Sequence, residues 1–330
     1  MLQSVDEARQ RIATGEPLLL AGSDWALSQL PRGEWVGGTI PYFMDVQGGI
    51  CSETLVFVDR VPACAAEIEI RQYTAAGIFP GICADAPANG YSFLLIPGGS
   101  AVHAVYAQGA PGQEGVLATP VAGWVSGVHV SRVGLERPKV FNGRTGESSS
   151  EWAVVMHVAL PSGKMACLDV VNVFKPGQGD VIRFPASGFS AIDCTINGRP
   201  ASFPRYLLEA KPDPCVPLTA WHNGAVINVG LQGFDEITGA IHFYAPVFAG
   251  TEYRFAEPVP DYVAAFDAAM ESHRAPAVFS CNCILNYLYA KLEGKRTGAI
   301  TGPITYGEIA GRLLNQTLVR LLVNEASVAA

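Results

Sequence analysis

The sequence is poor in charged residues and has no excess of basic ones. Of its 330 residues, 16% are charged, whereas soluble proteins average roughly 25%. Asp and Glu outnumber Lys and Arg by 30 to 22, which gives a net charge of −8, and no stretch gathers Lys and Arg into a cluster. Nucleic-acid binding is therefore excluded, because it requires basic side chains for the phosphates. Disorder is excluded as well, because 49% of the residues are hydrophobic.

Long hydrophobic runs are also missing. The longest, such as 16–21 and 92–97, fall well short of the roughly 20 residues that a membrane-spanning helix needs. The first 16 residues are polar and lack the basic and apolar regions of a signal peptide. The eight cysteines are scattered, and most lie among apolar residues, as buried free thiols do. We therefore predict a cytoplasmic protein with reduced cysteines and no membrane contact.

Several catalytic and cofactor motifs are absent. There is no Walker loop, no Gly-x-Gly-x-x-Gly turn after a strand and no Gly-x-Ser-x-Gly elbow. The six histidines lie far apart without the spacing of a zinc site, and no Cys-x-x-Cys-His motif attaches a haem. We therefore predict no metal and no cofactor. One alternative stays open, a noncovalent haem with His157, His222 or His242 as its axial ligand.

Glycine and proline, by contrast, are abundant, with 35 and 23 residues. Most of them lie between short apolar stretches, which is typical of strands joined by turns. Residues 151–174 indicate two strands joined as a hairpin by a Pro-Ser-Gly-Lys turn, and Asn197-Gly198 indicates another tight turn. Helices are expected after two serine caps, Ser4 and Ser100.

These patterns together predict an α+β fold. The chain is expected to be strand-rich and two-lobed, with mixed β-sheets covered by a few helices. We place the boundary of the lobes in the middle of the sequence, which gives one lobe from 1–150 and another from 151–330.

The most informative local pattern is Cys281-Asn282-Cys283. Residues two apart on a strand share a face, so both thiols point to the same side. Two core thiols at the end of a strand are one interpretation. The other is that the strand ends at a pocket, as strands in open α/β sheets often do, with Cys281 in the pocket wall. A nucleophilic Cys281 would need a lowered pKa, and the helix expected from about residue 285 is the nearest source of one.

A second pattern is the turn Tyr306-Gly307-Glu308. The glycine and the preceding proline of this stretch permit a tight turn whose backbone is exposed. A phenol and a carboxylate on such a turn suit a polar ligand group. An ordinary surface loop between two strands is the alternative interpretation.

These stretches together resemble the C-terminal part of FIST domains. The shared pattern is an apolar strand ending in a Cys (277–284), a Gly-Pro turn that carries Gly-Glu (302–308), and a strand with Asn-x-Thr (315–317). Residues 34–44 and 91–99 are similar to the N-terminal FIST part, and 180–207 and 237–255 to its strand-rich segment. The resemblance covers most of the chain and is specific in the last 55 residues.

The resemblance implies a noncatalytic intracellular sensory protein that binds a small metabolite such as an amino acid. It identifies 1–150 as the FIST N-terminal lobe and 151–330 as the C-terminal lobe. Some members of the family bind haem and sense nitric oxide, so a haem-binding gas sensor is an alternative. Members usually carry a signalling output, which is not seen in this sequence. We therefore expect signalling in trans, through a partner protein or a homodimer.

The predicted ligand site joins the two ends of the chain. Glu308 would accept a hydrogen bond from the ligand, and Tyr306 would donate one. A cysteine-dependent hydrolase or acyltransferase that uses Cys281 is the competing hypothesis. The predicted site residues are Gly38, Thr39, Tyr42, Cys281, Asn282, Cys283, Tyr306, Gly307 and Glu308.

Overall fold

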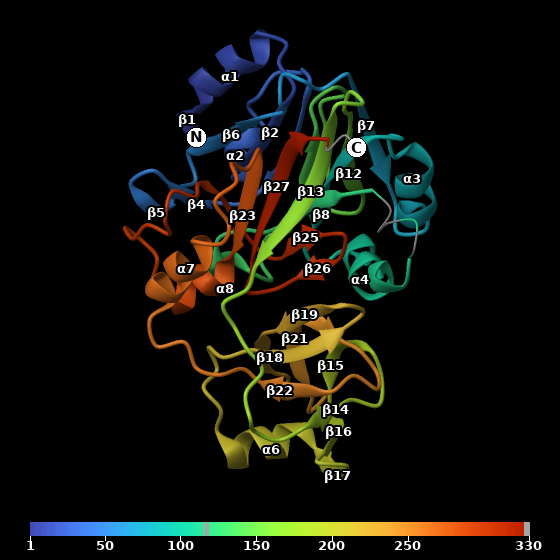
Figure 1. The fold of residues 1–330 in the computed structure, drawn as a ribbon, viewed down its shortest axis with the longest axis vertical. Helices are drawn as coiled ribbons and strands as arrows, with labels where there is room; N and C mark the ends of the chain where they lie inside the picture. Colours follow the sequence, from blue (N-terminus) through green and yellow to red (C-terminus); the bar gives the residue numbers. More distant parts are fainter. Residues whose placement is uncertain (114, 116–118, 327–330) are drawn as a thin grey trace.

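The computed structural model describes residues 1–113, 115 and 119–326 (Figure 1). Strands make up 42% of the chain and helices 19%, which confirms the predicted α+β class. Three of the five sheets contain one parallel pair of strands among antiparallel ones.

The three mixed sheets lie together in the upper part of Figure 1, which we call the large lobe. The first sheet has the order β1 (Leu2–Ser4), β6 (Leu55–Arg60), β2 (Leu18–Gly22), β3 (Trp35–Thr39), β10 (Val140–Asn142) and β11 (Glu147–Ser149). The second has the order β26 (Leu313–Leu314), β25 (Glu308–Ala310), β9 (Val121–Ser126), β8 (Gly90–Pro97), β12 (Ala153–Ala159) and β7 (Glu67–Tyr73). The third has the order β13 (Lys164–Val171), β27 (Leu318–Glu325), β23 (Phe279–Cys283), β24 (Gly302–Thr305), β4 (Tyr42–Asp45) and β5 (Gly48–Cys51).

The lower part of Figure 1, the small lobe, is formed by one continuous stretch between β13 and α7. Both of its sheets are antiparallel. The first has the order β17 (Arg199–Ser202), β16 (Asp193–Ile196), β14 (Ile182–Arg183), β22 (Tyr253–Phe255), β18 (Leu218–His222) and β19 (Ala225–Val229). The second has the order β15 (Gly188–Ala191), β21 (Ile241–Val247) and β20 (Leu231–Phe234).

Helices cover the outer faces of the sheets. They are α1 (Val5–Ala13), α2 (Asp24–Leu27), α3 (Ile78–Asp85), α4 (Ala101–Gly109), α6 (Phe203–Ala210), α7 (Tyr262–Met270) and α8 (Ile284–Tyr289), with two 3-10 turns, η1 (Ala110–Gly112) and η2 (Val130–Arg132).

The two faces of β2 show how the large lobe is layered. Leu18 and Leu20 belong to a cluster with residues of α1 and α2, whereas Leu19 and Ala21 point into the central core. Successive residues of a strand point to opposite faces, so a strand buried on both faces is apolar throughout. β8 divides its residues in the same way between the central core and a cluster with α3 and α4.

The lobe boundary predicted after residue 150 does not follow the pairing of the strands. The C-terminal strands β24 and β25 pair with β4 and β9 of the N-terminal half, so the end of the chain completes sheets begun near its start. The small lobe is instead an insertion, which leaves the large lobe after β13 and returns before α7.

The predicted hairpin at 151–174 is also wrong, although both of its strands exist. β12 pairs with β7 and β8 in the second sheet, whereas β13 pairs with β27 in the third. The turn between them therefore leads from one sheet to another. The short-range predictions are confirmed: Asn197 and Gly198 turn between β16 and β17 with positive φ angles of 51° and 81°. Ser4 and Ser100 cap α1 and α4.

Candidate functional site

The predicted strand that ends in the two cysteines is β23, and α8 follows it directly. Cys281, Asn282 and Cys283 are all buried. Across the parallel pair of β23 with β24, the hydroxyl of Thr305 lies 3.3 Å from the carbonyl oxygen of Asn282. The carboxyl end of β23 is therefore a buried polar region rather than an open pocket wall.

Glu308 belongs to this buried region and is not part of an exposed turn. It is the first residue of β25 and is 0% exposed. Its Oε2 accepts hydrogen bonds from the backbone N–H and hydroxyl of Thr317 at 3.2 and 2.9 Å, and its Oε1 accepts one from Thr305 at 3.4 Å. These donors carry no charge, so burial dominates and raises the pKa of Glu308 to about 8. The carboxyl group is therefore mostly neutral at pH 7.

Asn282 and Asn286 form a linked pair of amides at the start of α8. The Asn282 Oδ1 accepts from the backbone N–H of Cys283 at 2.7 Å and from the Asn286 Nδ2 at 2.9 Å. Asn286 is 2% exposed, and its Oδ1 has no hydrogen-bond partner in the structure. A buried acceptor without a partner is costly, so it marks a place where a donor is missing.

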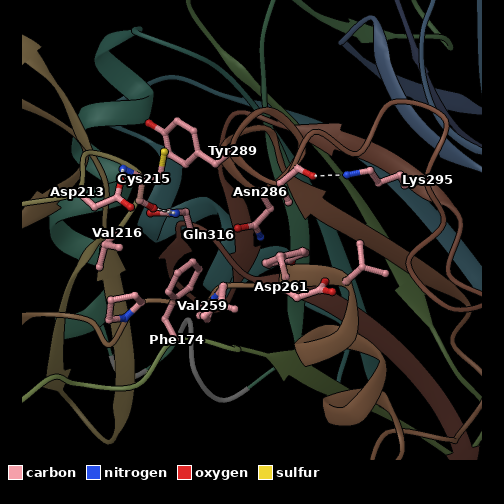
Figure 2. Close-up of a pocket in the computed structure, with 15 residues that line it drawn as sticks. Phe174, Asp213, Cys215, Val216, Val259, Asp261, Asn286, Tyr289, Lys295 and Gln316 are labelled. Carbon is pink, nitrogen blue, oxygen red and sulfur yellow. Dashed lines mark hydrogen bonds between the residues drawn. The ribbon is translucent and has the colours of Figure 1, made fainter.

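Asn286 faces a cavity of about 540 Å³ between the lobes (Figure 2). Figure 2 shows Asn286 near the centre of the lining, with Gln316 on one side and Lys295 on the other. The Gln316 Nε2 donates to the carbonyl oxygen of Cys215 at 3.1 Å, which ties the β26–β27 turn to the small lobe. Other lining residues are Phe174, Asp213 and Val216 near the small lobe, and Val259, Asp261, Tyr262 and Tyr289 around α7 and α8.

The other predicted residues gather around the loop that follows β9. The backbone N–H of Gly127 donates to the Thr39 carbonyl oxygen at 2.8 Å. The Tyr306 hydroxyl donates to the Val128 carbonyl oxygen at 2.6 Å, and the Tyr42 hydroxyl accepts from the backbone N–H of Val130 at 3.1 Å. Both phenols are thus committed to holding this loop in place.

The two glycines of the predicted site have packing roles. A Cβ at Gly38 would lie 2.8 Å from the indole nitrogen of Trp124, and one at Gly307 would lie 2.7 Å from Leu313. Thr39 lines a separate cleft of about 320 Å³. The structure therefore divides the predicted residues into two groups. The group with Asn282 contacts Asn286, which lines the cavity between the lobes, and the group with Thr39 adjoins the β9 loop. None of the predicted residues lines that cavity itself.

Sequence reasoning missed the two amides that line the cavity, Asn286 and Gln316. Asn286 carries no periodicity signal, since Asn282 lies at the end of the strand β23 and Asn286 lies in the helix α8 that follows it. Gln316 carries no such signal either. Its position depends on the left-handed backbone at this residue, φ 52°, and on contact with the small lobe.

The thiols lack the environment of a catalytic nucleophile. Cys281 is 1% exposed, and its Sγ lies 3.5 Å from the carbonyl oxygen of Gly123, as expected of a protonated thiol that donates. Burial raises the pKa of both Cys281 and Cys283 well above the ordinary value, and the nearby Glu308 acts in the same direction. An activated thiol needs the opposite shift. The hypothesis of a cysteine-dependent enzyme thus gains no support.

Two observations bear on metal and haem binding. Among the residues that the structure describes, no three His, Cys, Asp or Glu side chains come together to hold a metal ion. Both ring nitrogens of His157 are in hydrogen bonds, to Ser92 at 2.8 Å and to Tyr73 at 2.9 Å. This histidine is therefore committed to the protein and has no nitrogen left for iron.

These features define an α+β protein of two lobes with a polar cavity between them. The chain belongs to a family of unknown function, DUF6976, whose sequence model matches residues 3–324. No curated protein matches the sequence. The family match carries no link to FIST domains, so that resemblance stays a prediction. Within the described part of the chain, no helix is long and apolar enough to cross a membrane.

Proposed function

We propose that this protein is a noncatalytic small-molecule-binding protein whose ligand occupies the cavity between the lobes. The observation that carries the proposal is that Asn286 lines the cavity and that its buried acceptor, Oδ1, has no partner among the residues that the structure describes. A ligand that donates to this atom would remove the cost of leaving it unpaired.

The size and lining of the cavity suit a small polar metabolite. Its volume of about 540 Å³ lies within the roughly 300–1,000 Å³ typical of ligand sites. Phe174, Val216 and Val259 supply apolar wall, while Asp213, Asp261 and Lys295 supply charges of both signs. An amino acid or a similar metabolite carries matching apolar and charged groups.

The proposed role is sensory. The cavity lies between two lobes, so a bound ligand would change how the small lobe is held against the large one. A partner protein, or a second copy of the chain, could detect that change, which is signalling in trans. The eight free cysteines support a reducing compartment, and we propose the cytoplasm.

The test is a thermal-shift screen with amino acids, nucleotides, other small metabolites and haem. A ligand at 100 times its Kd adds about 2.7 kcal/mol to the stability of the folded state. We expect at least one metabolite to stabilise the wild type and to lose most of its effect on Asn286→Leu. Asn324→Leu makes the same change at an exposed position of β27 and should respond like the wild type.

Two results would overturn the proposal. One is that no compound in the screen stabilises the wild type. The other is that a stabilising compound acts equally on Asn286→Leu, since its binding would then not involve the cavity. Isothermal titration of the wild type supplies a second measurement that does not depend on the thermal stability of the variant.

A further inference from the structure

The hydrogen bonds around the cavity fix which end of each lining amide faces the ligand. The backbone N–H of Cys283 can only donate, so the atom of Asn282 that it meets is the amide oxygen. The amide of Asn286 meets that same oxygen and must do so with its nitrogen. The end of Asn286 that is left without a partner is therefore its oxygen, an acceptor.

The same reasoning applies to Gln316 on the other side. The carbonyl oxygen of Cys215 can only accept, so the amide nitrogen of Gln316 faces it. The second atom of that amide is again an oxygen. Two independent protein groups, a backbone N–H and a backbone carbonyl, thus orient the two amides. In each amide the oxygen, an acceptor, is the atom that these hydrogen bonds do not use.

The charged groups of the lining add to this excess of acceptors. Asp213 and Asp261 each use Oδ1 to accept one backbone N–H, from Cys215 and Ala264, and each carries a second carboxylate oxygen. The one cation of the lining, Lys295, is exposed and donates to the carbonyl oxygen of Ala290 at 3.2 Å. The lining therefore carries two carboxylates against one cation, and all three groups are exposed and lie at the rim; the hydroxyls of Tyr262 and Tyr289 are further groups that can donate.

We infer that the ligand is recognised through a primary ammonium group, which donates to the Oδ1 of Asn286. This inference rests on the proposed function and names the chemistry of the same site. An ammonium has three donors and no acceptor, so it satisfies Asn286 and is attracted by the two carboxylates. A ligand that brings a carbonyl or carboxylate oxygen to Asn286 places one acceptor against another and is disfavoured.

Leucine and two of its derivatives test this inference by titration calorimetry and thermal shift. Leucinamide keeps the ammonium and lacks the carboxylate, whereas N-acetylleucine keeps the carboxylate and lacks the ammonium. The apolar wall of Phe174, Val216 and Val259 suits the side chain that all three share. We expect leucinamide to bind at least tenfold more tightly than N-acetylleucine, and Asn286→Leu to bind leucinamide at least tenfold more weakly than the wild type.

Two variants serve as controls. Asn324→Leu should bind leucinamide as the wild type does. Asp261→Asn retains a cap for α7 and removes one negative charge from the lining, so it should weaken leucinamide binding several-fold and should not weaken the binding of N-acetylleucine. This variant keeps the test decisive if Asn286→Leu does not fold.

The possible failures are distinguishable. If N-acetylleucine binds as well as leucinamide and both lose affinity in Asn286→Leu, the site stands and the ammonium inference is wrong. The same holds if the metabolite screen finds a cavity ligand without an ammonium group. If neither these compounds nor any in the screen bind, the inference and the proposed function fail together.

Discussion

Replacing Glu308 with glutamine is expected to remove a loss of stability that the wild type suffers between pH 6 and pH 9. In the folded protein this carboxyl is fully buried and its pKa is raised to about 8, against an ordinary value of 4.5 in the unfolded chain. Between these two values the unfolded chain releases the proton while the folded protein keeps it. Stability therefore falls as the pH rises, and the fall ends once the pH has passed about 8.

The size of the effect follows from the two pKa values. From pH 6 to pH 9 the expected loss is about 3 kcal/mol, at 1.36 kcal/mol for each unit of differential titration. For a chain of 330 residues that unfolds as one unit, this loss corresponds to a fall in Tm of roughly 4 °C. Glutamine keeps an oxygen that can accept from Thr317, and it does not titrate.

The other titratable groups that face Glu308 keep their protons in the folded protein over this pH range. Thr305 and Thr317 do not titrate, and burial raises the pKa of Cys281 and Cys283, so both thiols stay protonated below pH 9. Burial likewise raises the pKa of Tyr262, the other titratable group nearby. The thiols add a loss of their own near pH 9, where the unfolded chain releases their protons, so Glu308 is reported by the difference between the wild type and Glu308→Gln.

The assay is urea unfolding of the wild type, Glu308→Gln and Glu236→Gln at pH 6, 7, 8 and 9. Glu236 is exposed, so its variant makes the same chemical change without altering a buried group. We expect the wild type and Glu236→Gln to lose about 3 kcal/mol more than Glu308→Gln over this range. Equal losses in all three proteins would refute the reasoning, because Glu308 would then titrate alike in the folded and unfolded states.

Three further predictions concern other parts of the fold. Burial lowers the pKa of His157 to about 4, so below about pH 6.5 the unfolded chain takes up a proton that the folded protein does not, and acidification from pH 7 to pH 4 should cost the wild type about 3 kcal/mol more than His157→Gln in urea unfolding. His157→Gln should show a shallower acid loss, and an unchanged one would contradict this. Arg312 donates to two carbonyls in the β18–β19 turn, so Arg312→Ala should speed amide exchange in that hairpin far more than in β8, and uniform acceleration would speak against it. Iodoacetamide should modify the exposed Cys83 long before Cys281, as followed by peptide mass spectrometry, and preferential labelling of Cys281 would revive the nucleophile hypothesis.

Local patterns determined a large part of the secondary structure. The caps at Ser4 and Ser100 and the turn at Asn197-Gly198 are confirmed because each depends on contacts within a few residues. The strand that ends at Cys283 and the helix that follows it also lie where the pattern placed them. The α+β class follows from the sum of such local preferences.

Local patterns did not predict which strands pair with one another. The sequence around Pro161–Lys164 suits a hairpin, and the strands on both sides exist, yet β12 and β13 join different sheets. A turn signal reports the direction of the chain over four residues. The partner of each strand is decided by the apolar faces that the rest of the chain offers, which here include strands from the far end of the sequence.

Local sequence patterns are enough to predict the strand-rich class, the caps and the turns, and they show that residues such as Asn282 and Glu308 are polar. What those residues do depends on the tertiary structure. It buried Glu308 beside uncharged donors, which makes it a neutral structural acid, and it placed Asn286 in the wall of a cavity. That cavity is lined by segments as distant as Phe174 and Gln316, and their meeting depends on how the small lobe is inserted into the large one.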